Sequence, residues 1–275
     1  MKRLKIKQAV IFLFASMLAL ACAAGSFARA QNAQQMLDTV IAHENEAAAH
    51  RGHYTYRSEE RSDRTNGHLW VEHVAETNWG KVRYLVSEDG EPLSGDRLAA
   101  ENARVADEAA HPDTFKLKEA ARADDEQHAK QMLALLPKAF LFDPPQQQGA
   151  DFRIAFRPNP DYRPQSMEER VLHGMSGTVS IDQKTIRLHE IEGKMAQDVS
   201  IGFGLLATIR AGSSFTSKRA HEEGLDWKTQ ALHTDIRGKA LFLKTIARQQ
   251  ESTHSEFKRV ADDITVADAV ALLKR

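Results

Sequence analysis

Alternation of apolar and polar residues with a period of two is the feature that most constrains how this chain can fold. It is clearest in "GMSGTVSIDQKTIRLHEIEGK", residues 174–194, where Val179 and Ile181 alternate with polar residues, "DQKT" follows, and Ile186 and Leu188 resume the alternation. Successive side chains of a β-strand point to opposite faces, so this pattern predicts a hairpin with one apolar face. Nothing in the hairpin suggests catalysis.

The same period recurs along most of the chain. It returns in "HYTYRSEER", "HLWVEHVAE" and "KVRYLVSEDG", again around Phe152, Ile154 and Phe156, and then almost without interruption from the hairpin to Val260. The last part divides into "AQDVSIGFG", "SSFTSKRAHEEG", "WKTQALHTDIRG", "KALFLKTIARQ" and "STHSEFKRV". Roughly nine or ten strands joined by tight turns predict an antiparallel sheet.

Helical segments interrupt the strand pattern in three places. "NAQQMLDTVIAHENEAAAH" spaces Met36 and Val40 as an amphipathic helix does. Residues 96–136 are rich in Ala, Glu, Lys and Arg and predict a charged helical insert, broken at "HPDT", where Pro112 suits a helix boundary. Thr265 can cap a last helix. The expected fold is therefore α+β, mainly antiparallel β, with helices gathered on one face of the sheet.

Residues 1–30 have the features of a signal peptide. A basic start precedes the uncharged apolar run 9–24, and "ARA" ends at Ala30, just before the expected cleavage at Gln31. A retained membrane anchor is the alternative, but the run is shorter than the about 20 residues of a spanning helix. We expect an exported periplasmic protein, with one domain formed by residues 31–275.

Cys22 is the only cysteine, and it lies inside the leader. Cleavage at Gln31 would leave no disulfide, no thiolate nucleophile and no cysteine metal ligand. "ALAC", which ends at Cys22, partly resembles a lipobox, although the leucine at Leu18 stands one place too early. Lipid anchoring through Cys22 is therefore the alternative to a soluble periplasmic protein.

The charge balance excludes one class of partner. The leader removes five basic residues and no acidic residue, so the mature chain has 32 basic and 38 acidic residues and a net charge of −6. Nucleic-acid binding requires a clustered positive surface, and no run of this sequence provides one. We expect no nucleic-acid partner.

Three motifs that could carry chemistry each lack a required part. "GFGLLA" is not followed by the long helix that a dinucleotide site needs. In "HGMSG", Ser176 precedes a strand and lacks the spacing of a nucleophile elbow, so it is interpreted as a turn serine. His43, His50 and His53 do not have the i, i+4 spacing of a helical zinc site and are interpreted as a solvated face. We therefore predict no catalytic residue, no metal and no cofactor.

Apolar residues on both faces of a strand indicate a hydrophobic site. In "ALFLKTIA", Leu241 and Leu243 point one way, whereas Phe242 and Ile246 point the other. The second apolar face must meet the inserted helices, a partner or a hydrophobic ligand. Ordinary core beneath helices and a ligand cavity both remain open at this point.

The order of these segments resembles a known family. "RYLVSEDGEPLS" leads into the charged insert, "RPNPDYRP" precedes "GMSGTVSIDQKTIRLHEIEG", and strands run to the end. Together they resemble periplasmic proteins of the outer-membrane lipoprotein-sorting superfamily. The resemblance implies a curved, incomplete β-barrel with helices covering its concave face, and an apolar cavity that in the carrier members holds acyl chains. The long charged insert departs from a simple carrier.

The expected function is binding of hydrophobic ligands, namely acyl chains of lipids or lipoproteins, by a carrier or chaperone. A protein-interaction or envelope-stress sensing module on the same fold is the alternative, with other envelope proteins as partners, and a metal-dependent hydrolase comes after it. The predicted lining consists of alternating strand positions: Tyr54, Tyr56, Trp70, Val74, Phe152, Ile154, Phe156, Val179, Ile181, Phe203, Phe242 and Ile246.

Overall fold

The structure is a computed structural model that describes residues 32–201, 207–221, 224–240 and 245–275. Within these ranges the side chains of residues 121–129, 201, 240, 245 and 246 are not described. The predicted signal peptide lies outside the described residues, as do Phe203 and Phe242.

Among the described residues, one antiparallel sheet of 14 strands forms the body of the molecule. Its main path runs β4-β3-β2-β1-β14-β13-β12-β9-β8-β7-β5, while β6 pairs with β7, and β11 pairs with β10 and β13. The strands are β1 Tyr54–Ser62, β2 Trp70–Thr77, β3 Gly80–Glu88, β4 Glu91–Pro92, β5 Phe140–Phe142, β6 Gln146–Gln148, β7 Asp151–Pro158, β8 Met175–Asp182, β9 Leu188–Met195, β10 Val199–Ile201, β11 Ala207–Ile209, β12 Ser214–Ala220, β13 Lys228–Ala240 and β14 Thr245–Arg259.

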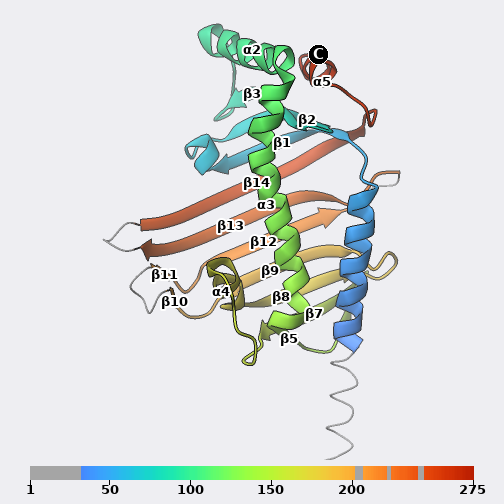
Figure 1. Cartoon of the computed structure of the whole chain (residues 1–275), viewed down its shortest axis with the longest axis vertical. Helices are drawn as coiled ribbons and strands as arrows, with labels where there is room; N and C mark the ends of the chain where they lie inside the picture. The colour runs from blue at the N-terminus through green and yellow to red at the C-terminus, as the bar shows by residue number, and fades with distance from the viewer. Residues whose placement is uncertain (1–31, 202–206, 222–223, 241–244) are drawn as a thin grey trace, which may run out of the picture.

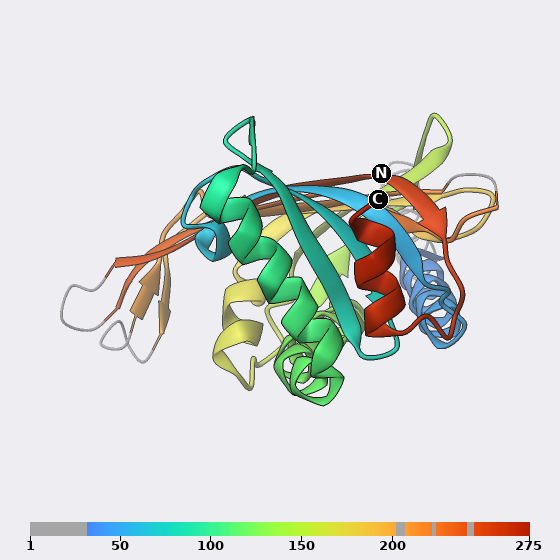
Figure 2. The same cartoon turned by 90° about the horizontal axis from the view of Figure 1, so that it is seen from above.

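The sheet is curved and open. Its two end strands, β4 and β5, are not paired with each other in the part of the chain that the structure describes. Seen from above, the strands form an arc with helices beneath it (Figure 2). This is the open α+β half-barrel that the sequence predicted.

Two helices lie over the concave face (Figure 1). One is the N-terminal helix, residues 32–49, and the other is α3, Pro112–Ala139, which crosses the strands. The remaining helices are shorter or lie at the ends of the sheet: the 3-10 helix η1 Asp63–Thr65, α2 Gly95–Ala110, α4 Met167–His173 and α5 Val266–Leu273. No helix within the described ranges has the length and apolar character needed to cross a membrane.

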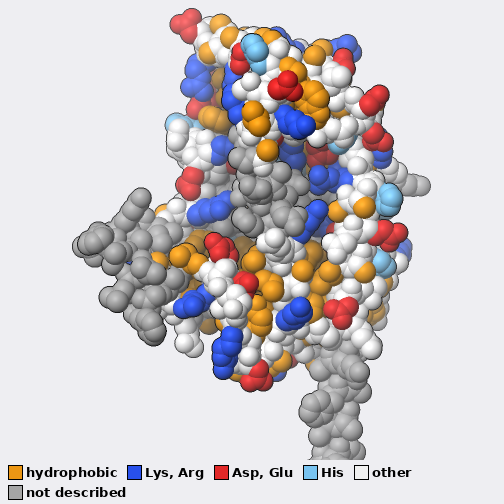
Figure 3. All heavy atoms as spheres, in the orientation of Figure 1, with side chains coloured by type: hydrophobic (Ala, Val, Ile, Leu, Met, Phe, Trp, Pro, Cys, Tyr) orange, Lys and Arg blue, Asp and Glu red, His pale blue; other side chains and the backbone are white. Residues whose placement is uncertain are grey.

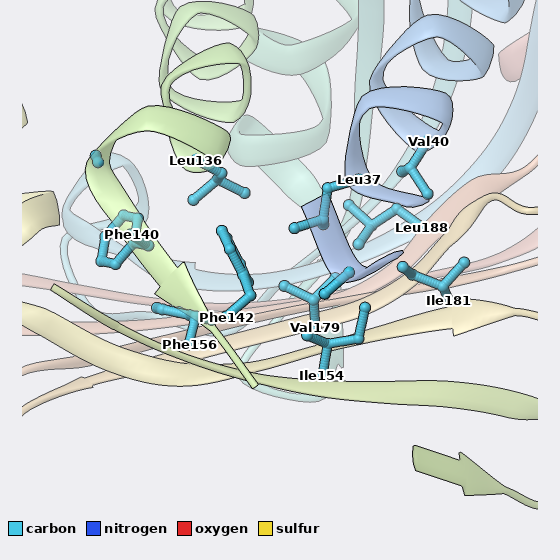
Figure 4. Packing of buried hydrophobic residues seen from close by; sticks show 12 residues of the cluster. Leu37, Val40, Leu136, Phe140, Phe142, Ile154, Phe156, Val179, Ile181 and Leu188 are labelled. Carbon is cyan, nitrogen blue, oxygen red and sulfur yellow. The ribbon is translucent and has the colours of Figure 1, made fainter. Parts of the chain in front are cut away.

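The main apolar core lies where these two helices meet β5, β7, β8 and β9. Leu37 and Val40 of the N-terminal helix point towards Ile154, Val179 and Ile181 of the sheet (Figure 4). These five side chains are at most 2% exposed. The other members are Ala33, Leu136, Ala139, Phe140, Phe142, Phe156 and Leu188. We call these four strands, with the helix residues that cover them, the apolar half.

A second core lies on the opposite face of β2 and β3. Ala75 and Val82 pack against Val266 and Val270 of α5, together with Val105 of α2. These strand residues alternate with Val74 and Arg83, which face the concave side. The outer face of this end of the sheet is therefore also covered by helices.

The free edge of β3 is capped by side chains of the helical insert. The backbone N–H groups of Lys81 and Leu85 donate to Glu119 Oε2 at 3.0 Å and to Glu101 Oε1 at 2.8 Å. Arg104 donates to the carbonyl oxygen of Arg83. These bonds satisfy a strand edge that would otherwise be open to pairing with another chain.

Several predicted boundaries are correct. The hairpin forms β8, which ends at Asp182, and β9, and the insert is broken at His111 between α2 and α3. The Thr265 side chain accepts from the Asp268 N–H and caps α5, as predicted.

Other boundaries were wrong. The described ranges contain fourteen strands rather than nine or ten, because short pairings such as β4, β5 and β6 are set by their neighbours in the sheet and not by their own alternation. The three strands expected after Leu225 are the two long strands β13 and β14. Helix α4 was not predicted, and Ser176 lies in β8 rather than in a turn.

Candidate functional site

The predicted lining residues do not come together in one place. Seven are buried: Tyr54, Tyr56, Val74, Ile154, Phe156, Val179 and Ile181. Trp70 and Phe152 are half-buried, and the side chain of Ile246 is not described. The buried residues divide between the apolar half and the strands β1 and β2 at the other end of the sheet.

In the apolar half the predicted residues are covered by helices. Ile154, Phe156, Val179 and Ile181 belong to one packed cluster, and Phe152 packs against it. Their aliphatic and aromatic surface faces Leu37 of the N-terminal helix and Leu136 of α3 (Figure 4). A hydrophobic ligand would reach them by taking the place of helix side chains.

In the other half the predicted aromatic residues lie beside charges. The Lys228 ammonium lies 3.6 Å from the ring centroid of Tyr54, and the Arg64 guanidinium lies 5.4 Å from that of Trp70. Both distances are within the range of cation–π attraction. These rings are therefore part of a polar environment.

A cavity of about 640 Å³ lies between the concave side of β14, β1, β2 and β3 and the first half of α3. We call it the polar cavity. Its lining is mostly charged or polar: Arg51, His53, Glu60, Ser62, Asp63, Arg64, Glu76, Thr77, Asn78, Trp79, Gly80, Lys81, Arg83, Lys116, Glu119, Ala120, Arg248 and Gln250. A second cavity, of about 420 Å³, shares Arg64, Lys81, Arg83 and Glu119 with it and extends towards α2.

Arg64 is fixed in the wall of the polar cavity by two carboxylates. Its Nη2 donates to Glu60 Oε2 at 2.6 Å and to Glu72 Oε2 at 2.7 Å, and its Nη1 donates to Glu72 Oε1 at 3.0 Å. The helix η1 that carries Arg64 is itself capped by Ser62, whose Oγ accepts the Arg64 N–H. Local structure therefore positions the guanidinium before any ligand binds.

The ionisation of this cluster follows from its contacts. Burial alone would raise the pKa of Glu60, but hydrogen bonds from Arg64 and Ser62 lower it by more. Burial alone would lower the pKa of Arg64, but Glu72 and Glu60 raise it. The ion pair is therefore fully charged at neutral pH.

Arg83 is less completely paired than Arg64. Its Nη1 lies 3.7 Å from Glu72 Oε2, which is too long for a hydrogen bond. Its Nε is buried and has no hydrogen-bond partner among the described residues. Across the cavity, Arg248 and Lys116 are exposed, so this side opens to solvent.

The N-terminal helix is held to the sheet by a separate ion-pair cluster. Glu44 Oε1 accepts from Arg187 Nε at 2.8 Å and Oε2 accepts from Arg187 Nη2 at 2.9 Å, while Arg219 Nη1 lies 2.7 Å from Oε2. Burial alone would raise the pKa of Glu44, but the Arg187 hydrogen bonds and the Arg219 charge lower it by more. This cluster fastens the helix over the apolar half.

The three histidines considered as a metal site are separated by the fold. His43 Nδ1 lies 3.2 Å from the carbonyl oxygen of Ile186, whereas His50 is exposed and His53 lies at the polar cavity. In the described part of the chain, no group of three or more His, Cys, Asp or Glu side chains could hold a metal ion.

The charged lining was missed from the sequence, although its signal is present. Tyr54 and Tyr56 begin an alternation that continues through Ser58, Glu60 and Ser62, so these polar residues occupy the same face of β1. If the alternation had been continued beyond the two tyrosines, it would have predicted the Glu60 carboxylate on the concave side.

Comparisons with known proteins give one structural similarity. No protein-family model matches the chain, and no curated protein matches it. Among solved structures, it is similar to a domain from Vibrio parahaemolyticus described as an outer membrane lipoprotein-sorting protein domain. The match has 9% sequence identity and a TM-score of 0.28, and covers 87% of this chain and 100% of the other. A similarity of this size carries no functional argument, so function must be inferred from the residues of this chain.

Proposed function

We propose that this protein is an exported binding module of the cell envelope that carries an amphiphilic ligand, with an acyl chain, on the concave face of its half-barrel. The observation that carries this proposal is the covering of that face: two helices close it where further strands would close a barrel, and a cavity of about 640 Å³ remains beneath α3. Small-molecule sites commonly have volumes of about 300–1,000 Å³.

The apolar half supplies the surface for the acyl chain. Leu37 and Val40 are the helix side chains that cover Ile154 and Val179. An acyl chain that took their place would exchange one apolar contact for another, so the sheet residues would stay dry. Each methylene removed from water contributes about 0.8 kcal/mol, and a long chain therefore provides substantial affinity without a reactive group.

The N-terminal helix is suited to move as a cover. It is continuous in sequence with the leader, and apart from its apolar side it is held by the Glu44 cluster and by the contact of His43 with the carbonyl oxygen of Ile186. The proposed mechanism is capture, shielding and release: the helix lifts, the acyl chain enters, and the helix closes over it.

Gentle extraction tests the proposal. Protein purified from its own envelope should carry acyl chains detectable by mass spectrometry, and the emptied protein should bind an apolar fluorescent probe. Leu37→Ala removes cover from the site and should change the probe affinity by several-fold, while Leu117→Ala, which trims a side chain that is 75% exposed, should leave it unchanged. If the protein is lipid-free and also fails to bind the probe, the proposed lipid binding is wrong and only the description of the fold stands.

A sensing module would give a different result. It would bind an envelope protein with or without lipid, so capture of a partner by lipid-free protein that does not bind the apolar probe would favour that function.

The proposed export is tested at the N-terminus. The signal-peptide features predict that N-terminal sequencing of the envelope protein will give Gln31. A chain that begins at a lipidated Cys22 would instead make the protein membrane-anchored.

A further inference from the structure

We propose that the polar cavity is a subsite for an anionic head group of the phosphate type, with Arg83 and Arg248 as its anion contacts. This inference rests on the proposed function, because it assigns the second part of the same ligand. An anionic amphiphile would place its chain in the apolar half and its charge beneath the first half of α3.

The concave face changes character along the sheet. On the side of the molecule where the helices cover this face, Figure 3 shows most of the hydrophobic surface in the lower part and several Lys and Arg side chains around the middle. The register of the strands explains the change. Ser58 of β1 lies opposite Glu72 of β2, and Ser62 of β1 lies opposite Gln250 of β14. Arg83 of β3 lies opposite Val74 of β2, on the same face. Polar residues of β14, β1, β2 and β3 are therefore neighbours on the concave face.

The polar cavity has an excess of positive charge. Its lining contains six cationic side chains, Arg51, Arg64, Lys81, Arg83, Lys116 and Arg248, and four acidic ones, Glu60, Asp63, Glu76 and Glu119. Because arginine does not lose its proton in proteins, most of this positive charge is permanent. A partly enclosed cavity also strengthens the field that an entering anion meets.

Three of the four acidic side chains are already engaged by other groups, and the fourth, Asp63, is exposed to solvent. Glu60 is bound by Arg64, and Glu76 pairs at 3.3 Å with Lys228, a lysine outside the cavity lining. Glu119 accepts the backbone N–H of Lys81. These carboxylates are therefore poor acceptors for a cationic ligand, whereas donors remain for an anion.

Arg83 is the donor best placed for this role. Its Nε is buried without a hydrogen-bond partner among the described residues, although a buried donor is normally satisfied. A guanidinium can bind a phosphate or carboxylate through two parallel N–H groups. Arg248, on β14 at the open side, is exposed and lines the same cavity, so it can complete the contact.

Arg64 has a different role. Its two carboxylate partners already use its Nη groups, so it forms the wall that keeps the Glu60 and Glu72 charges away from the anion. The structure thus separates a saturated arginine, which shapes the cavity, from a partly free one, which meets the ligand.

Three probes test the subsite on the mature chain: dodecyl phosphate, dodecyl maltoside and inorganic phosphate. We expect dodecyl phosphate to bind at least about tenfold more tightly than dodecyl maltoside, because hydrogen bonds to a charged group are stronger than those to a neutral one. The preference should decrease as the salt concentration increases. Isothermal titration calorimetry measures all three affinities.

Arg83→Gln with Arg248→Gln should remove the preference for dodecyl phosphate and leave the dodecyl maltoside affinity unchanged. Arg153→Gln is the matched control, because Arg153 is an exposed arginine paired with Glu192 on the outer face of the sheet. Circular dichroism and thermal melting confirm that each variant is folded. Should the double variant unfold, Arg248→Gln alone is used, since this residue is exposed.

The outcomes separate the two proposals. Equal binding of both dodecyl compounds by the wild-type protein overturns the anionic subsite and leaves the proposed function standing. Inorganic phosphate binding as tightly as dodecyl phosphate, and lost in the double variant, supports the anion site but assigns it to a free phosphate, which overturns the lipid function. Binding of none of the three overturns both.

Discussion

The half of the sheet formed by β5, β7, β8 and β9 and the half formed by β14, β1, β2 and β3 share one curvature and one alternation, but they carry opposite chemistry on the concave face. In the first, the inward positions are residues such as Ile154 and Val179, which are 0% and 1% exposed. In the second they include Glu60 and Arg83, which line the polar cavity, and Glu72, which lines the second cavity.

The difference follows from the free energy of removing each kind of side chain from water. Apolar side chains gain free energy when helices cover them, so the first half packs to the density of a protein core. Charged side chains must keep their partners or water, so a helix can lie over the second half without filling it. The cavity is thus a consequence of residue type at inward positions of the same sheet.

The largest expected effect comes from putting a charge into the apolar half. Ile154→Asp should unfold the protein, because an unpaired carboxylate would be buried in the centre of the cluster. Leu141→Asp, at a side chain that is 39% exposed on the neighbouring strand β5, should remain folded. Circular dichroism and urea denaturation measure both. A folded Ile154→Asp protein that has lost bound lipid would instead show that this position faces a ligand cavity.

Removal of the ion pairs that hold the N-terminal helix to the sheet should have the next largest effect on stability. Glu44→Gln leaves Arg187 and Arg219 without their carboxylate, and removal of one partner from a buried ion pair costs about 3 kcal/mol of unfolding free energy. Urea denaturation checks the value. Asp143→Asn, which removes an exposed ion pair with Arg157, is the control and should cost less than about 1 kcal/mol.

The same carboxylate predicts a pH dependence. The folded-state pKa of Glu44 lies below its ordinary value of 4.5, so its stabilising contribution is present above that pH and is lost as the pH falls further. Glu60, in the wall of the polar cavity, should act in the same direction. Stability measured between pH 7 and about pH 3 should therefore decrease less steeply in Glu44→Gln than in the wild-type protein; parallel curves would contradict the assignment.

The capped edge of β3 should give a smaller effect. Glu101→Ala removes the acceptor of the Leu85 N–H and a partner of Arg104, at a cost of about 1–3 kcal/mol. Hydrogen exchange of the Leu85 amide should become faster, while the amide of Ile181 in the apolar half should change only with global stability. Unchanged exchange at Leu85 would mean that the edge is protected by something other than this side chain.

The smallest effect is expected at a buried hydroxyl of β1, in the half of the sheet that carries the charged residues. Ser58 is 0% exposed, yet its Oγ has no hydrogen-bond partner among the described residues. Ser58→Ala should therefore change the unfolding free energy by less than about 0.5 kcal/mol, whereas Val179→Ala in the apolar half should cost about 2 kcal/mol. Similar costs at the two positions would remove the distinction between the halves.

Much of the local structure could be predicted. The hairpin at Asp182, the helix break at His111 and the cap at Thr265 depend on a few neighbouring residues, and each forms as expected. The candidate site could be predicted only in part. Ile154 and Val179 pair across β7 and β8 and share a face, whereas Tyr56 and Trp70 share theirs with charged residues of β1 and β2, so a single lining formed by all of them stays a prediction.

By itself, the sequence determined which residues share a face, because alternation along a strand is a local property of the backbone. Only the tertiary structure decided which faces meet: β1 pairs with β14, about 200 residues later, and Glu44 meets Arg187 and Arg219 across the fold. The polar cavity depends on such distant pairings, since Arg248 of β14 and Arg83 of β3 face it together. Strand order and curvature arise from long-range contacts that no single segment encodes, and for that reason the alternation predicted an antiparallel sheet but not the charge on its concave face.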